Sequence, residues 1–358
     1  MPNVKPEDMR ALTRDVFHAA GVPREDAEQA AHLMVLSNIR GHDSHGVRQI
    51  PRYLERLREK SIVAGKGLTI ERETPSLAVA NGNRNFGHVA ATHAMRLAIG
   101  KAKNVGVAAV AVHNLNHIGR VGAYPEMAAE EGLVGLLFVA SRGGDMAQVP
   151  FGGIEPRLAT SPISAAFPLP GSGPVLLDFA TSVVAANKVR QARDRQKPAG
   201  PNWLIDREGN AVDDPKLYME HKASLLPLGG VAAHKGYGLA VLSTIMGGIL
   251  SGGGTLASDL PIIGHDNLTF MIVLDPLAFV DKTFYEREIQ KLVDYLRATK
   301  VRPGDPAVQV PGEYEENWKR KVEAQGIEIE QPVWDNIAKA AESVGVPMPQ
   351  PIPAQPAR

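Results

Sequence analysis

Residues 105–112 form a near-continuous apolar run, VGVAAVAV, which constrains the fold more than any other segment. The run lacks the alternation of apolar and polar side chains that marks a strand with one solvated face, so it predicts a strand buried on both faces. Residues 133–139 and 268–274 repeat this pattern, and helical patterns at 88–103 and 124–131 precede the first two strands. The chain is therefore expected to fold as an α/β protein around a buried sheet.

Helices are expected at both ends of the chain, where prolines open them and glycines end them. Prolines at 303, 306 and 311 break the last helical part, and the proline-dense tail at 346–358 is expected to be disordered. The remaining expected elements are helices at 6–20, 23–40, 48–58 and 236–250 and strands at 76–80 and 174–179.

Composition narrows the classes of protein. The 358 residues carry 39 basic and 39 acidic side chains, and this balance argues against nucleic acid as a partner. The absence of cysteine excludes a disulfide scaffold, a thiolate zinc site and a cysteine nucleophile. No signal peptide is visible, and charged residues or glycines interrupt the apolar runs before membrane-spanning length, so a cytoplasmic protein with no membrane partner is expected.

A dense polar cluster, Gly-His-Asp-Ser-His-Gly at 41–46, opens the predicted helix at 48–58. Histidine exchanges protons near neutral pH, which makes His45 a candidate acid or base. Arg48 and Arg52 follow it, and arginine offers a fixed pair of donors to a carboxylate. Proton transfer beside anion binding is the chemistry that a small oxo acid needs. The alternative interpretation is a polar helix start in which Asp43 or Ser44 is the cap.

Two further polar loops stand out in the apolar frame. Residues 113–122 follow a buried strand and contain His113, His117 and Arg120, and functional groups often gather at the carboxyl ends of strands. Residues 232–238 place Lys235 among small side chains. A solvated loop and an ordinary helix start are the corresponding structural interpretations. The chain has no GxGxxG after a strand, no GxxxxGK[ST], no HExxH and no GxSxG, so no such motif identifies a cofactor.

Seven short segments, spread over most of the chain, form a recognisable set. They are Asp-Ser-His-Gly-Val at 43–47, Pro-Arg-Tyr at 51–53, Asn-His-Ile-Gly at 116–119, Pro-Phe-Gly-Gly at 150–153, Leu-Leu-Asp-Phe-Ala-Thr-Ser at 176–182, His-Lys-Gly-Tyr-Gly at 234–238 and Pro-Gly-Glu-Tyr-Glu at 311–315. Together these segments resemble the malate/L-lactate dehydrogenase family of nicotinamide oxidoreductases, which lack the Rossmann fold. Segments 113–122 and 312–317 resemble one subgroup of that family in particular.

The resemblance implies an NAD-dependent 2-hydroxyacid dehydrogenase (EC 1.1.1.-), with NADP as an open alternative and no metal. His45 matches the family's proton donor, and His117 matches a second active-site histidine. Substrate contacts are expected from Ser44, Arg48, Arg52 and Tyr53. Cofactor contacts are expected from Arg120, Gly122, Asp178, Phe179, Ala180, Thr181, Lys235, Asn267, Gly312 and Glu313.

Two departures from the family pattern affect the expected site. Gln49 stands where some members carry an active-site arginine, so Arg48 or Arg52 would have to hold the substrate carboxylate. Ala-Thr-Ser-Pro at 159–162 replaces the usual Gly-Thr-Asn-Pro, which bears on the geometry of that loop.

The same resemblance implies a mixed-sheet, non-Rossmann nicotinamide-binding domain, a helical domain built from both ends of the chain, and a homodimer. We assign 1–115 to the helical and α/β part of a substrate and dimer domain, 116–285 to the NAD(P)-binding domain, 286–345 to helices returning to the first domain, and 346–358 to the tail.

Three alternatives stay open. One is a metal-dependent lyase or hydrolase that uses His42, Asp43, His45, His113 and His117 as ligands. The second is a cyclic imino-acid reductase of the same family. The third is a catalytically silent dimeric protein that binds NADH.

Overall fold

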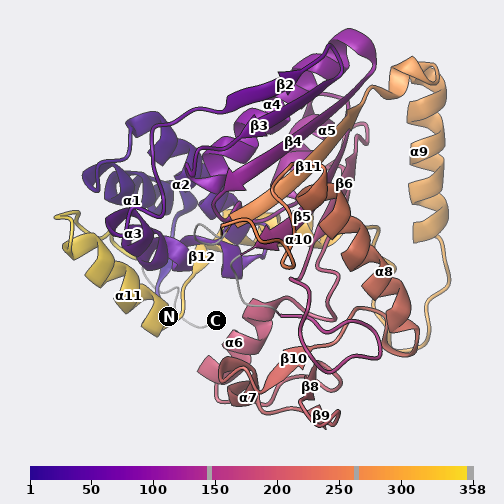
Figure 1. Cartoon of the computed structure of the whole chain (residues 1–358). Coiled ribbons are helices and arrows are strands. Elements are labelled where there is room, and N and C mark those ends of the chain that lie inside the picture. The colour runs from indigo at the N-terminus through magenta and orange to yellow at the C-terminus, as the bar shows by residue number, and fades with distance from the viewer. Residues whose placement is uncertain (143–146, 262–265, 353–358) are drawn as a thin grey trace.

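A seven-stranded mixed sheet forms the centre of the computed structural model, which describes residues 1–142, 147–261 and 266–352 (Figure 1). The strand order is β2-β3-β4-β11-β5-β6-β7, and only the β3–β4 pair is parallel among the neighbours in the described sheet. The strands are β2 Thr69–Glu73, β3 Leu77–Asn81, β4 Val107–Leu115, β5 Val134–Arg142, β6 Ile163–Phe167, β7 Val175–Phe179 and β11 Asp266–Leu274. The expected α/β fold with a mixed, buried sheet is confirmed.

Helices cover both faces of the sheet's middle strands. On one face, α4 Gly87–Val105 and α5 Ala123–Glu130 bury a core that includes Met95, Val110 and Leu137. On the other face, α8 Ala233–Ser243 continues into a π-helix, Thr244–Ile249, whose glycines lie against the backbone of β5 and β11. Burial on two faces explains why β4, β5 and β11 have apolar runs rather than alternating patterns.

The expected ranges differ from the structure by a few residues at several ends, and two of these differences have a clear local cause. The strand expected at 105–112 begins at Val107, because α4 extends through Val105 and Gly106 ends it with φ 85°. The helix expected at 236–250 begins at Ala233 and is α-helical only to Ser243, since the wider turns of the π-helix follow.

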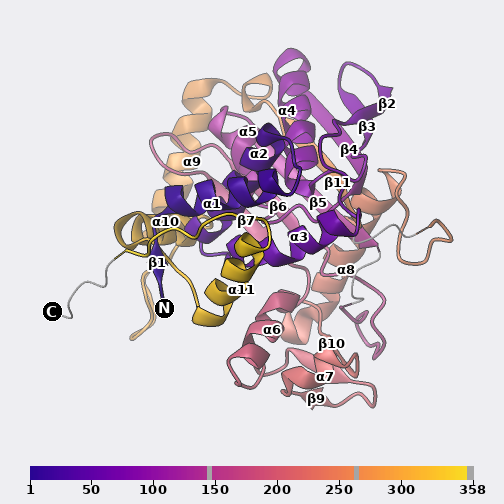
Figure 2. The same cartoon turned by 90° about the vertical axis from the view of Figure 1, so that its left-hand side faces the viewer.

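A helical layer joins the two ends of the chain (Figure 2). Its core includes Phe17, Met34, Tyr53 and Ile337, all fully buried. The elements of this layer are β1 Asn3–Val4, α1 Pro6–Ala19, α2 Arg24–Ile39, α3 Ile50–Arg58, α10 Glu313–Gln325, β12 Ile327–Glu328 and α11 Gln331–Glu342, with β1 and β12 paired antiparallel.

A small lobe, which the sequence patterns do not predict, lies beside these layers and has its own core around Val189, Leu204, Tyr218 and Leu225 (Figure 1). Helix α9, Lys282–Arg297, lies along the outside of the molecule. The elements of the lobe are α6 Ala186–Asp194, β8 Leu204–Asp206, β9 Ala211–Val212, α7 Pro215–Met219 and β10 Ala223–Leu225. Short 3₁₀ turns at Gly230–Ala232 and Pro276–Ala278 complete the described elements outside the site.

The proposed division of the chain stays a prediction. The main sheet contains β4 from one side of the 115/116 boundary and β5 from the other. In the expected tail, Met348 packs against the helical core and the Ile352 N–H donates to Asn3 O over 2.7 Å, whereas 353–358 lie outside the described residues. Within the described part of the chain, no helix combines the length and the apolar character needed to cross a membrane.

The start of α4 gives a test of the packing. A Cβ on Gly87 would lie 2.1 Å from Asn116 O and 2.4 Å from His117 O, so Gly87→Ala should push this backbone away and lower the free energy of unfolding by about 1–3 kcal/mol. Gly100 lies on the same helix with no atom within 4 Å of its added Cβ, so Gly100→Ala should be neutral or stabilise by up to about 1 kcal/mol. Urea unfolding of both variants measures the difference, and equal stabilities would contradict the close approach.

Candidate active site

Asn38 on α2 fixes the loop that carries His45. Its Nδ2 donates to Asp43 Oδ1 over 2.7 Å, and its Oδ1 accepts from the Val47 N–H over 2.9 Å. The loop folds as two 3₁₀ turns, Asp43–His45 and Val47–Gln49. A Cβ on Gly46 would lie 2.0 Å from Asn38 Oδ1, so glycine is required where the two turns meet. Asp43 is thus held by Asn38 and is not bonded to His45.

The second loop, at 115–122, is fixed from several directions. Asn116 is buried, and its Nδ2 donates to Arg84 O over 2.8 Å. The Ile118 N–H donates to Asn267 Oδ1 over 3.0 Å, and the Tyr124 hydroxyl donates to Ile118 O. These contacts place His117 at the end of β4 opposite the first loop.

The two loops bring His45 and His117 together. The imidazole rings stack with centroids 5.3 Å apart and 23° between planes, and Tyr53 Oη lies 2.6 Å from His117 Nδ1. Burial, then the nearby His42 and Arg120, lowers the pKa of His45 to about 4. Burial also holds the pKa of His117 well below its usual value and raises that of Tyr53. Both imidazoles and the phenol are therefore neutral near pH 7 in the free protein.

His88 is a third imidazole at this site, and sequence reasoning missed it. The side chain is fully buried, and neither ring nitrogen has a hydrogen-bond partner among the described residues. Its ring meets Tyr53 edge-on at 5.6 Å, and a Cβ on Gly119 would lie 2.4 Å from His88 Nε2. Burial lowers the pKa of His88 to about 3. The available signal was a histidine on the buried face of an alanine-rich helix.

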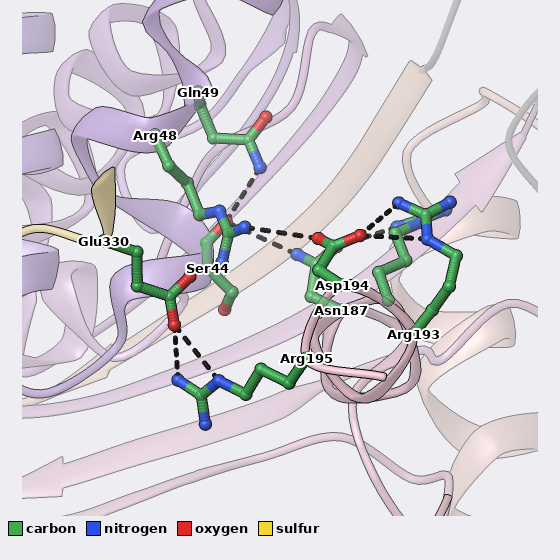
Figure 3. A network of polar contacts seen from close by, with 9 residues as sticks. Ser44, Arg48, Gln49, Asn187, Arg193, Asp194, Arg195 and Glu330 are labelled. Carbon is green, nitrogen blue, oxygen red and sulfur yellow. Dashed lines mark hydrogen bonds and ion pairs between the residues drawn. The ribbon is translucent and has the colours of Figure 1, made fainter. Parts of the chain in front are cut away.

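Helix α6 of the small lobe contacts the first loop (Figure 3). Arg48 Nη2 lies 3.7 Å from Asp194 Oδ2, and Asn187 Nδ2 donates to Ser44 O over 3.4 Å. Gln49 donates to the same Ser44 carbonyl over 2.8 Å. Just beyond α6, Arg195 pairs with Glu330 at 2.6 Å.

Arg52 differs from Arg48 in having no ion pair with any residue that the structure describes. Its side chain is exposed, and its charge contributes to the lowered pKa of His117. Arg52 is therefore an exposed guanidinium near His117 without an ion pair to any described residue, whereas Arg56, which also acts on His117, is buried.

A buried charge network adjoins the second loop. Arg120 pairs with Glu126, which also pairs with Arg40 at 3.2 Å, and Arg40 pairs in turn with Glu316. The Gly122 N–H donates to Asp178 Oδ2 over 2.8 Å, and burial raises the pKa of Asp178. Sequence reasoning missed Arg40, Glu126 and Glu316. The sequence pattern of a helix does not indicate that a charged side chain on it pairs with a distant one, and Arg40 and Glu316 are 276 residues apart.

The other expected cofactor residues are spread along β7 and beyond it. Thr181 follows Phe179 and Ala180 at the end of β7, and its N–H and hydroxyl both donate to Thr160 O over 2.9 Å. Lys235, in the first turn of α8, is exposed, and no hydrogen bond or ion pair joins it to the histidine pair among the described residues. Gly312 lies at the opposite end of β7, and Glu313 pairs with Arg297 at 2.6 Å, so the structure does not bring these two to the histidines.

The loop at 159–162 takes an unusual conformation where it departs from the family pattern. Ser161 is buried with φ 33°, in the left-handed region that asparagine tolerates better than serine. Its hydroxyl lies 3.3 Å from Thr244 Oγ1, which ties the loop to the π-helix.

The five ligands of the metal-dependent alternative do not converge as a set, although His45 and His117 stack on each other. His42 Nε2 lies 3.3 Å from Glu315, His113 Nε2 lies 3.0 Å from Glu71, and Asp43 bonds Asn38. Among the described residues, no group of three or more histidine or acidic side chains is arranged to hold a metal ion.

Known proteins are similar to this chain in sequence and in fold along nearly its whole length. The malate/L-lactate dehydrogenase family matches residues 4–338. Hydroxycarboxylate dehydrogenase B of Escherichia coli O157:H7 is 34% identical over 347 residues, which cover 95% of this chain and 94% of that protein. The L-lactate dehydrogenase of Cupriavidus necator is 34% identical over 343 residues, with 95% and 97% covered. The malate dehydrogenase structure of Pyrococcus horikoshii superposes with a TM-score of 0.87 at 31% identity, covering 97% of this chain and 96% of that one.

The shared fold and the sequence similarity place the chain among proteins of the hydroxy-acid dehydrogenase type. It belongs to the malate/L-lactate dehydrogenase family, as the motifs predicted. Hydroxycarboxylate dehydrogenase B is the subgroup that segments 113–122 and 312–317 resemble, and its members are among the relatives found.

The buried His88 makes a testable contribution to acid sensitivity. In the unfolded chain it binds a proton below about pH 6.5, whereas in the fold it stays neutral down to about pH 3. Its contribution to stability is therefore present above pH 6.5 and is lost as the pH falls from 6.5 toward 3, by about 2 kcal/mol at pH 5. His88→Gln should shrink the difference in unfolding free energy between pH 7.5 and pH 5 by about that amount.

Urea denaturation at the two pH values measures this effect. His93→Gln, on the same helix but with a partly exposed ring, controls for the loss of an imidazole. An unchanged pH dependence in His88→Gln would show that His88 is not the group responsible.

Proposed function

We propose that this protein is an NADH-dependent oxidoreductase that interconverts a small 2-hydroxy acid and its 2-oxo acid. The observation that carries the proposal is the stacked pair of His45 and His117 beside the unpaired guanidinium of Arg52. The pair offers proton transfer and hydrogen bonding to one oxygen, and Arg52 offers a fork for the neighbouring carboxylate.

The residues around Arg120 fit a nicotinamide cofactor. The Arg120 guanidinium is buried, and its Nε and Nη1 have no partner among the described residues, so two donors remain for an anionic group. A Cβ on Gly122 would lie 2.7 Å from Asp178 Oδ2 and 3.0 Å from Arg120 Nη1, so only glycine lets these two side chains pack closely against the backbone there. When bound, the cofactor supplies or accepts the hydride at the substrate C2. NADP is the alternative dinucleotide.

His45 is proposed to move the proton on the C2 oxygen. In oxidation the neutral imidazole takes the hydroxyl proton as the hydride leaves C2, and in reduction the imidazolium returns it. Because its pKa lies at about 4 in the free protein, the neutral form that oxidation needs predominates at pH 7. A bound carboxylate nearby favours the imidazolium, which loads the donor for reduction when a 2-oxo acid binds.

Arg52 is proposed to hold the substrate carboxylate, which orients C2 toward the cofactor. Arg48 can add a second contact only by leaving Asp194, which lies 3.7 Å from it. Ser44 lies in the same loop as His45, so its hydroxyl is a further candidate contact.

An oxidation screen tests the function. The purified protein should oxidise NADH, in preference to NADPH, with at least one member of a panel of short-chain 2-oxo acids, 2-oxo diacids and cyclic imines, and EDTA should not reduce the rate. Loss of near-ultraviolet dinucleotide absorbance is the measurement. Turnover of cyclic imines alone would favour the imino-acid reductase. Tight NADH binding without turnover would favour the catalytically silent protein, and loss of activity in EDTA would favour the metal-dependent enzyme.

His45→Ala sharpens this test. Turnover should fall by about two to four powers of ten, while the NADH dissociation constant stays nearly constant, because the imidazole acts on the substrate oxygen. His113→Ala is the matched control, since His113 lies on β4 just before the second loop and pairs with Glu71. Equal losses in both variants would contradict the assigned role of His45.

The protein is further proposed to be a homodimer, with a cytoplasmic location as the corresponding expectation. Helix α8 and the π-helix after it expose a row of large apolar side chains, and such a row favours burial against another subunit. The row consists of Leu242, Ile245, Ile249 and Leu250, exposed by 42–53%.

Sedimentation at micromolar concentration should therefore give about twice the 38.4 kDa chain mass. Ile249→Glu should shift the protein to monomer, because it places a charge in the proposed contact. Leu292→Glu is the control, since Leu292 is similarly exposed at 56% but lies on α9. If Leu292→Glu dissociated the dimer and Ile249→Glu did not, the contact between subunits would lie on α9 and the proposed interface would be wrong.

A further inference from the structure

Tyr53 stands in an almost entirely apolar surrounding, with one polar neighbour for its hydroxyl. The phenol is 1% exposed and its ring packs against Phe17, Phe86 and the edge of His88. The hydroxyl lies 2.6 Å from His117 Nδ1, and no other hydrogen-bond partner of Tyr53 is present in the described part of the chain. The direction of this one hydrogen bond therefore decides which nitrogen of His117 carries the ring proton.

Only one direction satisfies both groups. If His117 carried its proton on Nδ1, that N–H would donate to the phenol oxygen, and the buried Tyr53 O–H would have no acceptor. A buried donor without an acceptor is costly, whereas a phenol oxygen that only donates leaves no donor unsatisfied. The phenol therefore donates to Nδ1, and the proton of the neutral ring is on Nε2.

The surroundings keep the ring of His117 neutral. Burial is the main factor that lowers the pKa of this ring, and the guanidinium groups of Arg52 and Arg56 also oppose a positive charge on it. The Nε2 atom makes no hydrogen bond to any residue that the structure describes, so its N–H remains available for a ligand.

We infer that Tyr53 is a positioning residue that fixes His117 as the Nε2–H tautomer, so that His117 donates a hydrogen bond to the substrate C2 oxygen and does not accept its proton. This inference rests on the proposed function and separates the two histidines. His45, whose Nδ1 is buried without a partner, has no such constraint and is left as the group that transfers the proton. Tyr53, first expected to contact substrate, acts instead through His117.

Nitrogen-15 NMR of histidine-labelled protein tests the tautomer without any substrate. In the wild-type protein near pH 7, His117, assigned by its loss in His117→Gln, should show a protonated Nε2 and an unprotonated Nδ1. In Tyr53→Phe the two tautomers should become mixed. Tyr285→Phe is the control. It removes the hydrogen bond from another phenol, on α9, to Pro168 O, and should leave the spectrum of His117 unchanged.

Kinetics with a substrate from the oxidation screen provide the second readout. Tyr53→Phe should lower kcat by up to about a hundredfold with little change in KM for the oxo acid. His117→Gln keeps an amide donor and should therefore retain more activity than His117→Ala. If His117 instead accepted the substrate proton, both substitutions would remove the acceptor and the two variants would be equally inactive.

A wild-type His117 protonated on Nδ1, or equal activities of His117→Gln and His117→Ala, would overturn the inference while leaving the dehydrogenase proposal standing. Failure of the oxidation screen would remove the proposed function, and the NMR measurement would still report the tautomer. The wild-type spectrum decides the question even if Tyr53→Phe does not fold.

Discussion

The two ends of one amide, Asn38, set the position of the histidine site. Its nitrogen holds Asp43 and its oxygen holds the Val47 N–H, so the loop between them can close only around Gly46. Asn38 is itself positioned by α2, which packs in a core shared with Val322 on α10 and Ile337 on α11. The geometry of a loop near the N-terminus thus depends on helices from the other end of the chain. This dependence gives a physical reason for the return of the chain to its first layer.

Two kinds of buried polar group lie side by side near the site. Arg40, Glu126 and Arg120 form a paired network, in which each desolvated charge meets an opposite one. The three imidazoles of His45, His88 and His117 have no such partners and stay neutral instead. A neutral imidazole cluster can accept protons and give hydrogen bonds without paying for a permanent buried charge. The arrangement is suited to a reaction in which charge develops only during turnover.

The sequence predicted the centre of the fold more fully than its periphery. The runs at 105–112, 133–139 and 268–274 became the adjacent strands β4, β5 and β11, because burial on two faces leaves a clear apolar signature. The small lobe was missed, since strands of two or three residues carry too little pattern. The polar loops were recognised, but the stacking of His45 on His117 was not, because it depends on how α2 and β4 place two separate loops. His88 was hidden for a similar reason, since a histidine within an alanine-rich helix resembles any other core position.

The contact between α6 and the first loop has a consequence for ligand binding. Asp194 contacts Arg48 through a carboxylate, which is the group that a hydroxy-acid ligand would also offer. The Asp194 carboxylate belongs to the protein itself, whereas that of the ligand would come from solution. A ligand that engages Arg48 must displace this internal competitor, and the helix that bears Asp194 then loses one of its attachments to the loop. The Asn187–Ser44 hydrogen bond then remains, together with the ion pair from Arg195 to Glu330 at the start of α11, which is half-exposed and weakens as salt is added. The position of the small lobe against the helical layer therefore depends on the salt concentration and on whether a ligand is bound to Arg48.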